Sequence, residues 1–220
     1  MNVSEAVRNR KSVRAFLDRE VHRETIETVL DTARWAASGT NAQPWEVVVL
    51  TGEKKQKLCN SIGAAYHDGI RGKMDYNYYP VEWKDPFKAR RVECGKALYA
   101  ALDIQREDME RRKSQWAANY RAFDAPVMLL FFMDSILETG SYLDYGMFIQ
   151  SIMLAAMDNG LATCPQAALG EYPKIVKKFT GYGDGHVLVC GMAMGYEDET
   201  DPVNNYRTAR EPVSTFVRFN

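Results

Sequence analysis

The sequence has no excess of charge of either sign. Its 220 residues include 28 Lys and Arg and 29 Asp and Glu, which gives a formal net charge of −1 at pH 7. A broad positive field, which would attract nucleic acid or an anionic lipid surface, is therefore missing, and we expect neither partner. Any cationic binding site must be local.

Long apolar runs are missing as well. No stretch approaches the roughly 20 residues that a membrane-spanning helix needs, and residues 1–10 lack the apolar core of a signal peptide. These two features predict a cytoplasmic protein without a membrane partner. The length fits a single domain over residues 1–220, large enough to bury a sizeable core, with an excursion at about residues 66–122.

Metal-site and nucleotide-site motifs are also lacking. The four Cys and three His residues are scattered, without a C-x-x-C pair or zinc-site spacing, so we predict no metal and mostly buried, reduced thiols. Neither G-x-G-x-x-G nor G-x-x-x-x-G-K-[ST] occurs, and G-x-S-x-G is absent. Rossmann dehydrogenases, P-loop enzymes and serine esterases are thereby disfavoured.

Periodicity in the first half of the chain predicts helices around one strand. Apolar spacing indicates an amphipathic helix over residues 23–37, and β-branched residues indicate a strand over residues 45–51, followed by a helix over residues 53–65. Residues 66–87 have no clean period, which is typical of a long irregular excursion such as a lid or an interface arm. Residues 88–121 are predicted to be helical, with a break near Asp103.

The second half of the chain contains the most apolar segments. Residues 126–133 are nearly continuously apolar, which predicts a central strand buried on both faces. Residues 142–159 form an apolar helix that ends near Gly160, and a short strand and a helix precede a strand over residues 187–194. Residues 201–220 show little regular pattern. The order of elements predicts an α+β fold, a sheet wrapped by helices, instead of a strict βαβ alternation.

A cluster of cations lies near the N-terminus, at Arg10-Lys11-Ser12-Val13-Arg14. Three cations and one hydroxyl within five residues repel one another on a bare surface but are favourable opposite a phosphate or a negatively charged ring. A cationic helix end is the alternative, because Lys and Arg are also favourable near a helix C-terminus. Taken alone, the run leaves both interpretations open.

Two polar segments follow along the chain. Ser38-Gly39-Thr40-Asn41-Ala42-Gln43-Pro44-Trp45 has more hydroxyl and amide side chains than a simple turn requires. Cys164-Pro165-Gln166-Ala167-Ala168-Leu169-Gly170 follows the buried helix and either directs backbone N–H groups at a ligand or forms an ordinary loop. The cationic run and the first polar segment together predict a local site for an anion.

The sequence resembles the nitroreductase family of FMN-dependent oxidoreductases over nearly its whole length. The resemblance is carried by the segments Arg10 to Arg14, Ser38 to Trp45, Asp144 to Ala156, Cys164 to Gly170 and Arg207 to Pro212. The sequence most resembles the branch of the family that reduces nitroaromatic acids and related nitro compounds. The resemblance implies an α+β homodimer with a central, mostly antiparallel sheet wrapped by helices, exchanged terminal segments, and FMN at the subunit interface.

The same resemblance implies a role for individual residues. The N-terminal run would hold the phosphate, ribityl chain and pyrimidine edge of FMN, and Arg210, or Arg207, would also reach the phosphate. Asn41 and Gln43 would come from the other subunit, and residues 165–170 would line the flavin ring near N5. The implied cofactor-binding residues are Arg10, Lys11, Ser12, Arg14, Ser38, Thr40, Asn41, Gln43, Pro165, Gln166, Ala167, Leu169, Gly170, Arg207 and Arg210.

Residues 76–83 would overhang the flavin as a substrate cover, or would simply pack on the surface. The implied substrate-binding residues are Tyr76, Tyr79 and Phe123. The chain departs from the family pattern at two places. Lys11 stands where many relatives have Arg, and the Pro-x-Glu-Gly segment of the family is Pro165-Gln166-Ala167-Ala168 here, without the acid.

The activity that the resemblance implies is hydride transfer from NAD(P)H to a small nitroaromatic, or to a quinone, by a ping-pong mechanism. No catalytic side chain is expected, because the flavin carries the hydride. One alternative is a flavoenzyme of the same fold that acts on a specific metabolite, as a dehydrogenase or a reductive dehalogenase. Another is a flavin-binding protein without turnover. The spacing of cations does not distinguish NADH from NADPH.

Overall fold

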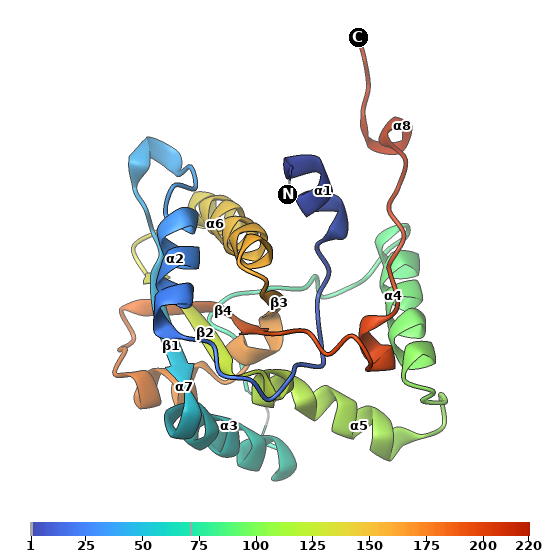
Figure 1. The fold of residues 1–220 in the computed structure, drawn as a ribbon, viewed down its shortest axis with the longest axis horizontal. Helices are drawn as coiled ribbons and strands as arrows, with labels where there is room; N and C mark the ends of the chain where they lie inside the picture. Colours follow the sequence, from blue (N-terminus) through green and yellow to red (C-terminus); the bar gives the residue numbers. More distant parts are fainter. Residues whose placement is uncertain (1, 71) are drawn as a thin grey trace.

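A computed structural model describes residues 2–70 and 72–220. Within these residues, four strands form one antiparallel sheet in the order β1-β2-β4-β3 (Figure 1). The strands are β1 (Glu46–Thr51), β2 (Val127–Asp134), β3 (Ala162–Gln166) and β4 (His186–Gly195). The mixed architecture with an antiparallel sheet confirms the predicted fold class.

Strand β2 is the centre of the sheet and of the core. It pairs with β1 on one side and β4 on the other, and Val127 through Met133 are fully buried. Successive residues point to opposite faces, so Leu129 packs into one apolar cluster and Leu130 into the other. A strand covered on both faces needs an uninterrupted apolar run, which is why the sequence identified it.

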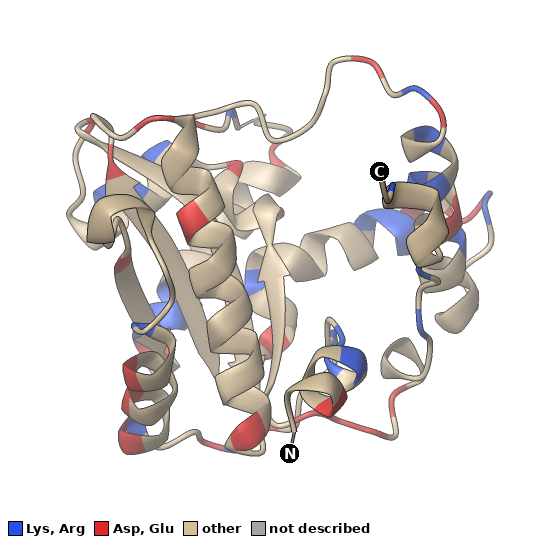
Figure 2. Cartoon of the chain, turned by 90° about the horizontal axis from the view of Figure 1, so that it is seen from above, with Lys and Arg blue, Asp and Glu red and all other residues tan. Residues whose placement is uncertain are grey.

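Helices cover both faces of the sheet. One apolar cluster joins the sheet to α2 (Arg23–Ala33) and α6 (Thr139–Asp158), and the other joins it to α3 (Gly52–His67) and α7 (Pro173–Thr180). Helix α6 carries only two charged residues, Asp144 and Asp158, and is drawn almost entirely tan in Figure 2. Among the described helices, none combines the length and the apolar character needed to cross a membrane.

The remaining elements lie around this three-layer body. Helix α4 stands to one side and touches the body near the C-terminal segment (Figure 1). The helices and short 3-10 turns not yet given are α1 (Val3–Asn9), η1 (Gly39–Asn41), α4 (Phe87–Ala101), α5 (Met109–Ala117), η2 (Ala118–Asp124), η3 (Ala167–Gly170), η4 (Pro202–Asn204) and α8 (Val213–Phe216).

Most predicted boundaries lie within three residues of those in the structure, and two larger differences bear on the site. The helix expected over residues 23–37 ends at Ala33, because residues 34–38 turn toward the polar segment instead of continuing the apolar stripe. Pro165 and Gln166 belong to strand β3, which pairs antiparallel with β4, so the segment interpreted as a loop or a ligand-facing turn begins as a strand. Pro165 is tolerated there because β3 is an edge strand.

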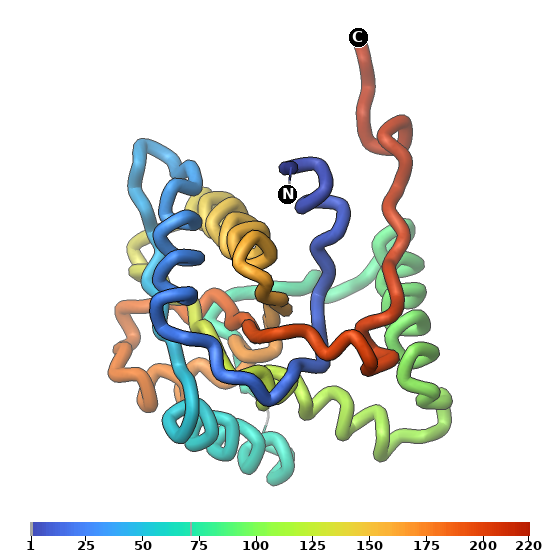
Figure 3. Tube along the Cα trace, viewed as in Figure 1, coloured from blue at the N-terminus to red at the C-terminus, as the bar shows by residue number. Residues whose placement is uncertain are grey.

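The N-terminal segment and the segment after β4 cross beside β3, as the blue and red tubes of Figure 3 show. Ser12 forms a parallel bridge with Thr163 of β3, and Phe16 forms an antiparallel bridge with Glu197. The backbone N–H of Val13 donates to the carbonyl of Thr163 at 3.0 Å. The segment around residues 12–16 and the segment that follows β4 are therefore held together at one edge of the sheet.

Candidate functional site

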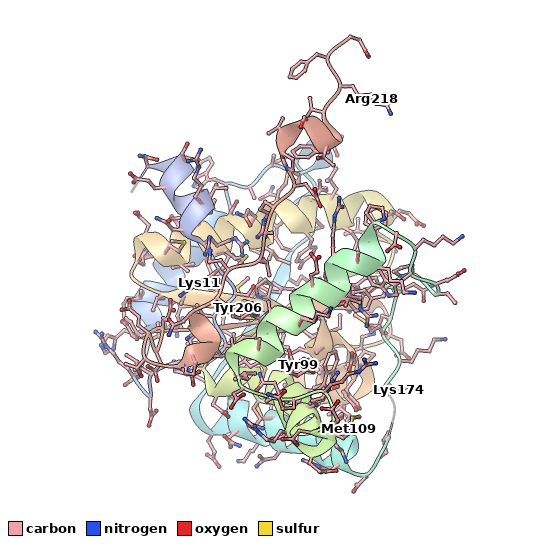
Figure 4. The ribbon with its side chains drawn as sticks, turned by 90° about the vertical axis from the view of Figure 1, so that its right-hand side faces the viewer. Lys11, Tyr99, Met109, Lys174, Tyr206 and Arg218 are labelled. Atoms are coloured by element: carbon pink, nitrogen blue, oxygen red, sulfur yellow. The ribbon has the colours of Figure 1, made fainter. Side chains whose placement is uncertain are left out.

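The cationic run and the C-terminal tail meet at a small cavity of about 140 Å³, which we call the cationic cavity. Figure 4 shows two of its lining residues, Lys11 and Tyr206, side by side. Six of the predicted cofactor-binding residues line this cavity: Arg10, Lys11, Ser12, Arg14, Arg207 and Arg210. Cys94, Tyr206 and Thr208 also line it and were not predicted, since only the fold brings α4 and the tail to this place.

The cations of the cavity differ in the contacts that they already make. The ammonium of Lys11 lies 2.5 Å from Glu197 and donates to the carbonyl of Asn204 at 2.7 Å, so its charge is neutralised within the chain. The guanidinium of Arg14 donates to the hydroxyl of Tyr206 at 3.1 Å and lies 6.0 Å from the ring centre of Phe123. Lys11 thus lines the cavity with an acidic partner already in place.

Uncompensated positive charge remains around Arg10. Burial lowers the pKa of Arg10 most, and the positive charges of Arg210 and Arg207 lower it further. Over residues 2–70 and 72–220, no acidic side chain pairs with Arg10, Arg14, Arg207 or Arg210. Guanidinium groups beside the hydroxyls of Ser12 and Thr208 are a donor set that fits a phosphate.

A second cavity of about 790 Å³, which we call the main cavity, adjoins the first through Arg10. Its volume lies within the range of roughly 300–1,000 Å³ of small-molecule sites. The junction of β3 with η3 contributes Pro165, Gln166 and Ala167, while the rest comes from α6, β4 and the excursion. Arg10 lines both cavities, so an elongated ligand with an anionic end can extend from one into the other.

Tyrosines line much of the main cavity. Tyr76, Tyr78 and Tyr142 line the main cavity, and the ring centres of Tyr76 and Tyr142 are 4.8 Å apart. The hydroxyl of Tyr76 donates to the carbonyl of Val189 at 2.7 Å, which fixes the excursion to β4. Burial raises the pKa of Tyr76 and of Tyr142, so both hydroxyls stay protonated at neutral pH. Tyr78 lies within the segment 76–83 that was predicted as a substrate cover, although it was not named individually, and Tyr142 was not predicted.

Gln166 is held rigidly at the wall of the main cavity. Its side chain is buried, and its Nε2 donates to the backbone carbonyl of Asn119 at 2.9 Å and to Asn119 Oδ1 at 3.3 Å. Asn119 belongs to η2, where Ala122 and Phe123 have left-handed backbone angles, with φ of 52° and 51°. Such conformations are costly for residues with a side chain and occur where the surroundings demand them.

The polar segment between α2 and β1 does not reach either cavity in the single chain. Ser38 Oγ accepts a hydrogen bond from the backbone N–H of Gln43 at 3.0 Å, while Thr40, Asn41 and Gln43 are exposed. Thr40, Asn41 and Gln43 have φ of 51°, 61° and 49°. The backbone N–H of Gly39 donates to Asp144 of α6 at 3.1 Å, so the turn is built onto the charge-poor helix.

Four more predicted residues line neither cavity. Phe123 and Leu169 are buried in the core, and Gly170 is buried beside Met74. Tyr79 is half exposed and packs on Tyr78, with ring centres 4.6 Å apart. Within one chain, Tyr76 is therefore the predicted substrate residue that the fold brings to the main cavity.

The fold and the two joined cavities define an α+β protein with a site for an elongated ligand that carries an anion at one end. The model of the nitroreductase family matches residues 7–196. The chain is 38% identical over 213 residues to a 4-nitrobenzoate reductase of Pseudomonas putida, across 97% of this chain and 93% of that protein.

Solved structures agree with this similarity. The FMN and NADPH-dependent nitroreductase NfnB of Sphigopyxis sp. strain HMH superposes with a TM-score of 0.97 at 38% identity, over 100% of this chain and 99% of that one. The FMN-dependent nitroreductase NfnB of Mycobacterium smegmatis, solved in complex with NADPH, gives a TM-score of 0.93 at 31% identity, over 99% and 97%. The chain belongs to the nitroreductase family. The predicted family, the α+β fold class and the class of enzyme, an oxidoreductase, are confirmed.

Proposed function

We propose that the protein is an FMN-dependent oxidoreductase that transfers hydride from NADPH to the nitro group of a small aromatic compound. The observation that carries this proposal is that Arg10 lines both the cationic cavity and the main cavity. FMN has a phosphate at one end and a flat ring at the other, which matches this pair of cavities. Relatives named as nitroreductases, two of them described with NADPH, support the donor and the substrate class.

The residues of the protein bind and orient the cofactor and the substrate, and bound FMN supplies the hydride chemistry. Arg10, Arg210 and the hydroxyls of Ser12 and Thr208 hold the phosphate. Arg14 supports this end of the site through Tyr206. No side chain needs to act as a general base.

The main cavity supplies the second half of the site. Pro165, Gln166 and Ala167 support one side of the ring, and Gln166 is immobilised by Asn119, so this wall does not need to rearrange when the ring binds. Tyr76, Tyr78 and Tyr142 form an apolar, aromatic wall beside which nicotinamide and nitroaromatic rings bind in turn. An aromatic wall also excludes water from the reacting atoms.

A second copy of the chain completes the site in this proposal. Leu143 and Met147 of α6 are 72% and 37% exposed, and Trp35, beside the polar turn, is 78% exposed. Apolar side chains exposed on a helix with few charges favour a subunit interface. Asn41 and Gln43, which reach neither cavity of their own chain, would then contribute to the site of the partner. Because NADPH is available in the cytoplasm, we expect the homodimer to work there.

Absorbance tests the cofactor and the activity together. The purified protein is expected to bind FMN, with a flavin band near about 450 nm that NADPH bleaches under anaerobic conditions and nitrobenzene restores. Parallel titration with NADH measures the donor preference, and 4-nitrobenzoate and a quinone test the range of oxidants. A protein that never binds FMN refutes the proposal. Bound FMN that neither nicotinamide bleaches indicates a flavin-binding protein without turnover.

Hybrid dimers test whether the two chains share a site. One subunit carries Arg10→Gln and the other carries Asn41→Ala with Gln43→Ala, and each variant is first measured as a homodimer. If Arg10 and the polar turn of opposite subunits serve one flavin, the mixed dimer regains one intact site, while both homodimers stay impaired. A mixed dimer with only the average activity of its parents contradicts the shared site.

A further inference from the structure

Arg207 makes contacts that differ from those of a phosphate ligand. Its Nη1 donates to the backbone carbonyls of Asn9 at 2.8 Å and Arg10 at 3.1 Å, and its Nη2 donates to the carbonyl of Arg8. These carbonyls belong to the last turn of α1 and to its C-cap, Arg10. The last carbonyls of a helix have no partners within the helix and form the negative end of its dipole. Arg207 therefore caps the C-terminus of α1 from the far end of the chain.

Helix α1 depends on such caps. It has seven residues, none of which is buried. A helix of this length is only marginally stable without tertiary support. Its N-terminus is held by a capping box, in which Asn2 accepts from the N–H of Glu5 at 2.9 Å and Glu5 accepts from the N–H of Asn2 at 3.1 Å. The guanidinium of Arg207 stabilises the C-terminus of α1 in the corresponding way.

The capped end of α1 is also where the site begins. Arg10 is the C-cap residue, and its side chain lines both the cationic cavity and the main cavity. Because Arg207 holds the carbonyl of Arg10 itself, the position of that backbone follows from the cap. Two residues further on, Ser12 is anchored by its bridge to Thr163 of β3. Arg10 is thus held between two fixed points.

Arg210 differs from Arg207 although both come from the tail. Its Nη1 bonds only to its neighbours in sequence, the carbonyl and hydroxyl of Thr208 and the carbonyl of Ala209. Nη2 and Nε of Arg210 have no protein acceptor among the described residues. A guanidinium has five N–H donors, so Arg210 keeps a free fork at the cationic cavity, whereas both terminal nitrogens of Arg207 already serve α1.

We propose that Arg207 is a positioning residue, which caps α1 and thereby places Arg10, and that Arg10 and Arg210 are the cations that hold the anion. This division of roles rests on the proposed function for the identity of the anion, the phosphate of FMN. The cap itself is a property of the protein without its cofactor. The two parts are therefore tested by separate measurements.

Hydrogen exchange of the FMN-free protein tests the cap. Arg207→Gln is expected to speed exchange of the amides in residues 3–10 by about fivefold, the loss of about one capping interaction. Arg210→Gln is the matched variant in the tail, and Arg23→Gln, on an exposed face of α2, is the surface control. Neither should change exchange in α1. Arg207→Ala repeats the test with a smaller side chain.

A double-mutant cycle on FMN affinity tests the division of roles. Arg10→Gln and Arg210→Gln each remove a charge-assisted contact, so each should raise the dissociation constant of FMN by about tenfold to a hundredfold. Arg207→Gln alone should raise it less, by about fivefold. If Arg207 acts through Arg10, Arg207→Gln adds less than about twofold in the Arg10→Gln background. Arg10→Gln combined with Arg210→Gln should instead raise the dissociation constant well beyond either single substitution, because each removes its own contact with the phosphate.

Either of two results overturns the proposal. One is unchanged exchange of α1 in both Arg207 variants. The other is an effect of Arg207→Gln that is fully retained in the Arg10→Gln background, which makes Arg207 an independent ligand of the phosphate. If the wild-type protein does not bind FMN, the proposed function fails, while the exchange of the FMN-free protein still decides whether Arg207 caps α1.

Discussion

Asn204 and Arg14 are joined across 190 residues of sequence by a hydrogen bond of 2.9 Å, in which Asn204 Oδ1 accepts from the backbone N–H of Arg14. The amide nitrogen of Asn204 donates to the carbonyls of Ala15 and Asp198, both at 2.9 Å. Asn204 is only 2% exposed. One buried side chain therefore fastens the cationic run to the segment that follows β4.

Asn204→Ala should weaken both the fold and the site. The substitution leaves the half-buried N–H of Arg14 without its acceptor, while the carbonyls of Ala15 and Asp198 each lose one of two donors. One group without a partner costs about 1–3 kcal/mol, so we expect the free energy of unfolding to fall by about that amount. The affinity for FMN should fall as well, because residues 10–14 lose the hydrogen bond that holds them in place. Urea denaturation of the FMN-free protein measures the first effect. Asn205→Ala, at an exposed neighbour, is the control, and an equal loss in both variants would contradict this role of Asn204.

Arg14→Ala should weaken FMN binding more than it lowers kcat. Arg14 lines the cationic cavity, bonds to Tyr206 and lies near Phe123, but it does not line the main cavity, to which the proposed function assigns the reacting rings. We expect the dissociation constant of FMN to rise by about tenfold, while kcat at saturating FMN changes little. Fluorescence titration with FMN measures the dissociation constant, and turnover with excess FMN measures kcat. Arg121→Ala, on the exposed face of η2, is the control, and unchanged FMN affinity would count against Arg14.

Tyr76→Phe should lower kcat/KM for the substrate more than it lowers the affinity for FMN. The variant keeps the ring against Tyr142 but loses the bond to the carbonyl of Val189, which holds the excursion over the main cavity. Loss of one hydrogen bond is worth about 0.5–1.5 kcal/mol, so kcat/KM for nitrobenzene should fall by about twofold to tenfold, mainly through KM. FMN affinity should stay constant. Tyr99→Phe on α4 is the control, and a fall in FMN affinity equal to that in kcat/KM would be the contrary result.

Glu171 should make stability depend on pH. Its carboxyl accepts a hydrogen bond from the hydroxyl of Tyr120 at 2.6 Å, yet burial raises its pKa above the ordinary value. The folded protein therefore binds this proton more tightly than the unfolded chain, and the stability that the proton gives is lost as pH rises through the folded pKa.

Glu171→Gln removes this titration while keeping an acceptor for Tyr120. We expect the variant and the wild type to have similar free energies of unfolding at about pH 4, below the ordinary pKa of a Glu carboxyl, and the variant to be the more stable at about pH 8. Urea denaturation at both values measures the difference. A variant that loses stability relative to the wild type as pH rises would show that the carboxylate is favoured in the folded state.

Local patterns in the sequence predicted much of the fold. The continuous apolar run at residues 126–133 gave the central strand β2, and the nearly uncharged segment at residues 142–159 gave α6. The break near Asp103 separates α4 from α5, and Asp103 has a left-handed φ of 47°. These features depend on residues close together in the chain, which is why periodicity detects them.

The sequence could not separate the roles of its cations. Lys11, Arg14, Arg207 and Arg210 are similar as charges, and their motifs pointed to one anion site. In the structure Lys11 is paired with Glu197, and Arg207 caps α1. Both contacts join segments from opposite ends of the chain, and no local pattern encodes a partner almost two hundred residues away.

The sequence by itself determined the α+β class and a local cluster of cations, because charge clusters and apolar periods are local properties, and its motifs carried the resemblance to the nitroreductase family that the comparisons confirmed. Tertiary structure alone decided that Arg10 stands where two cavities join, that tyrosines of the excursion and α6 form one wall, and that Asn204 and Arg207 hold the cationic run in place. The reason is physical: the direction of a side chain and the partner of its charge are set by packing among segments that only the folded chain brings together.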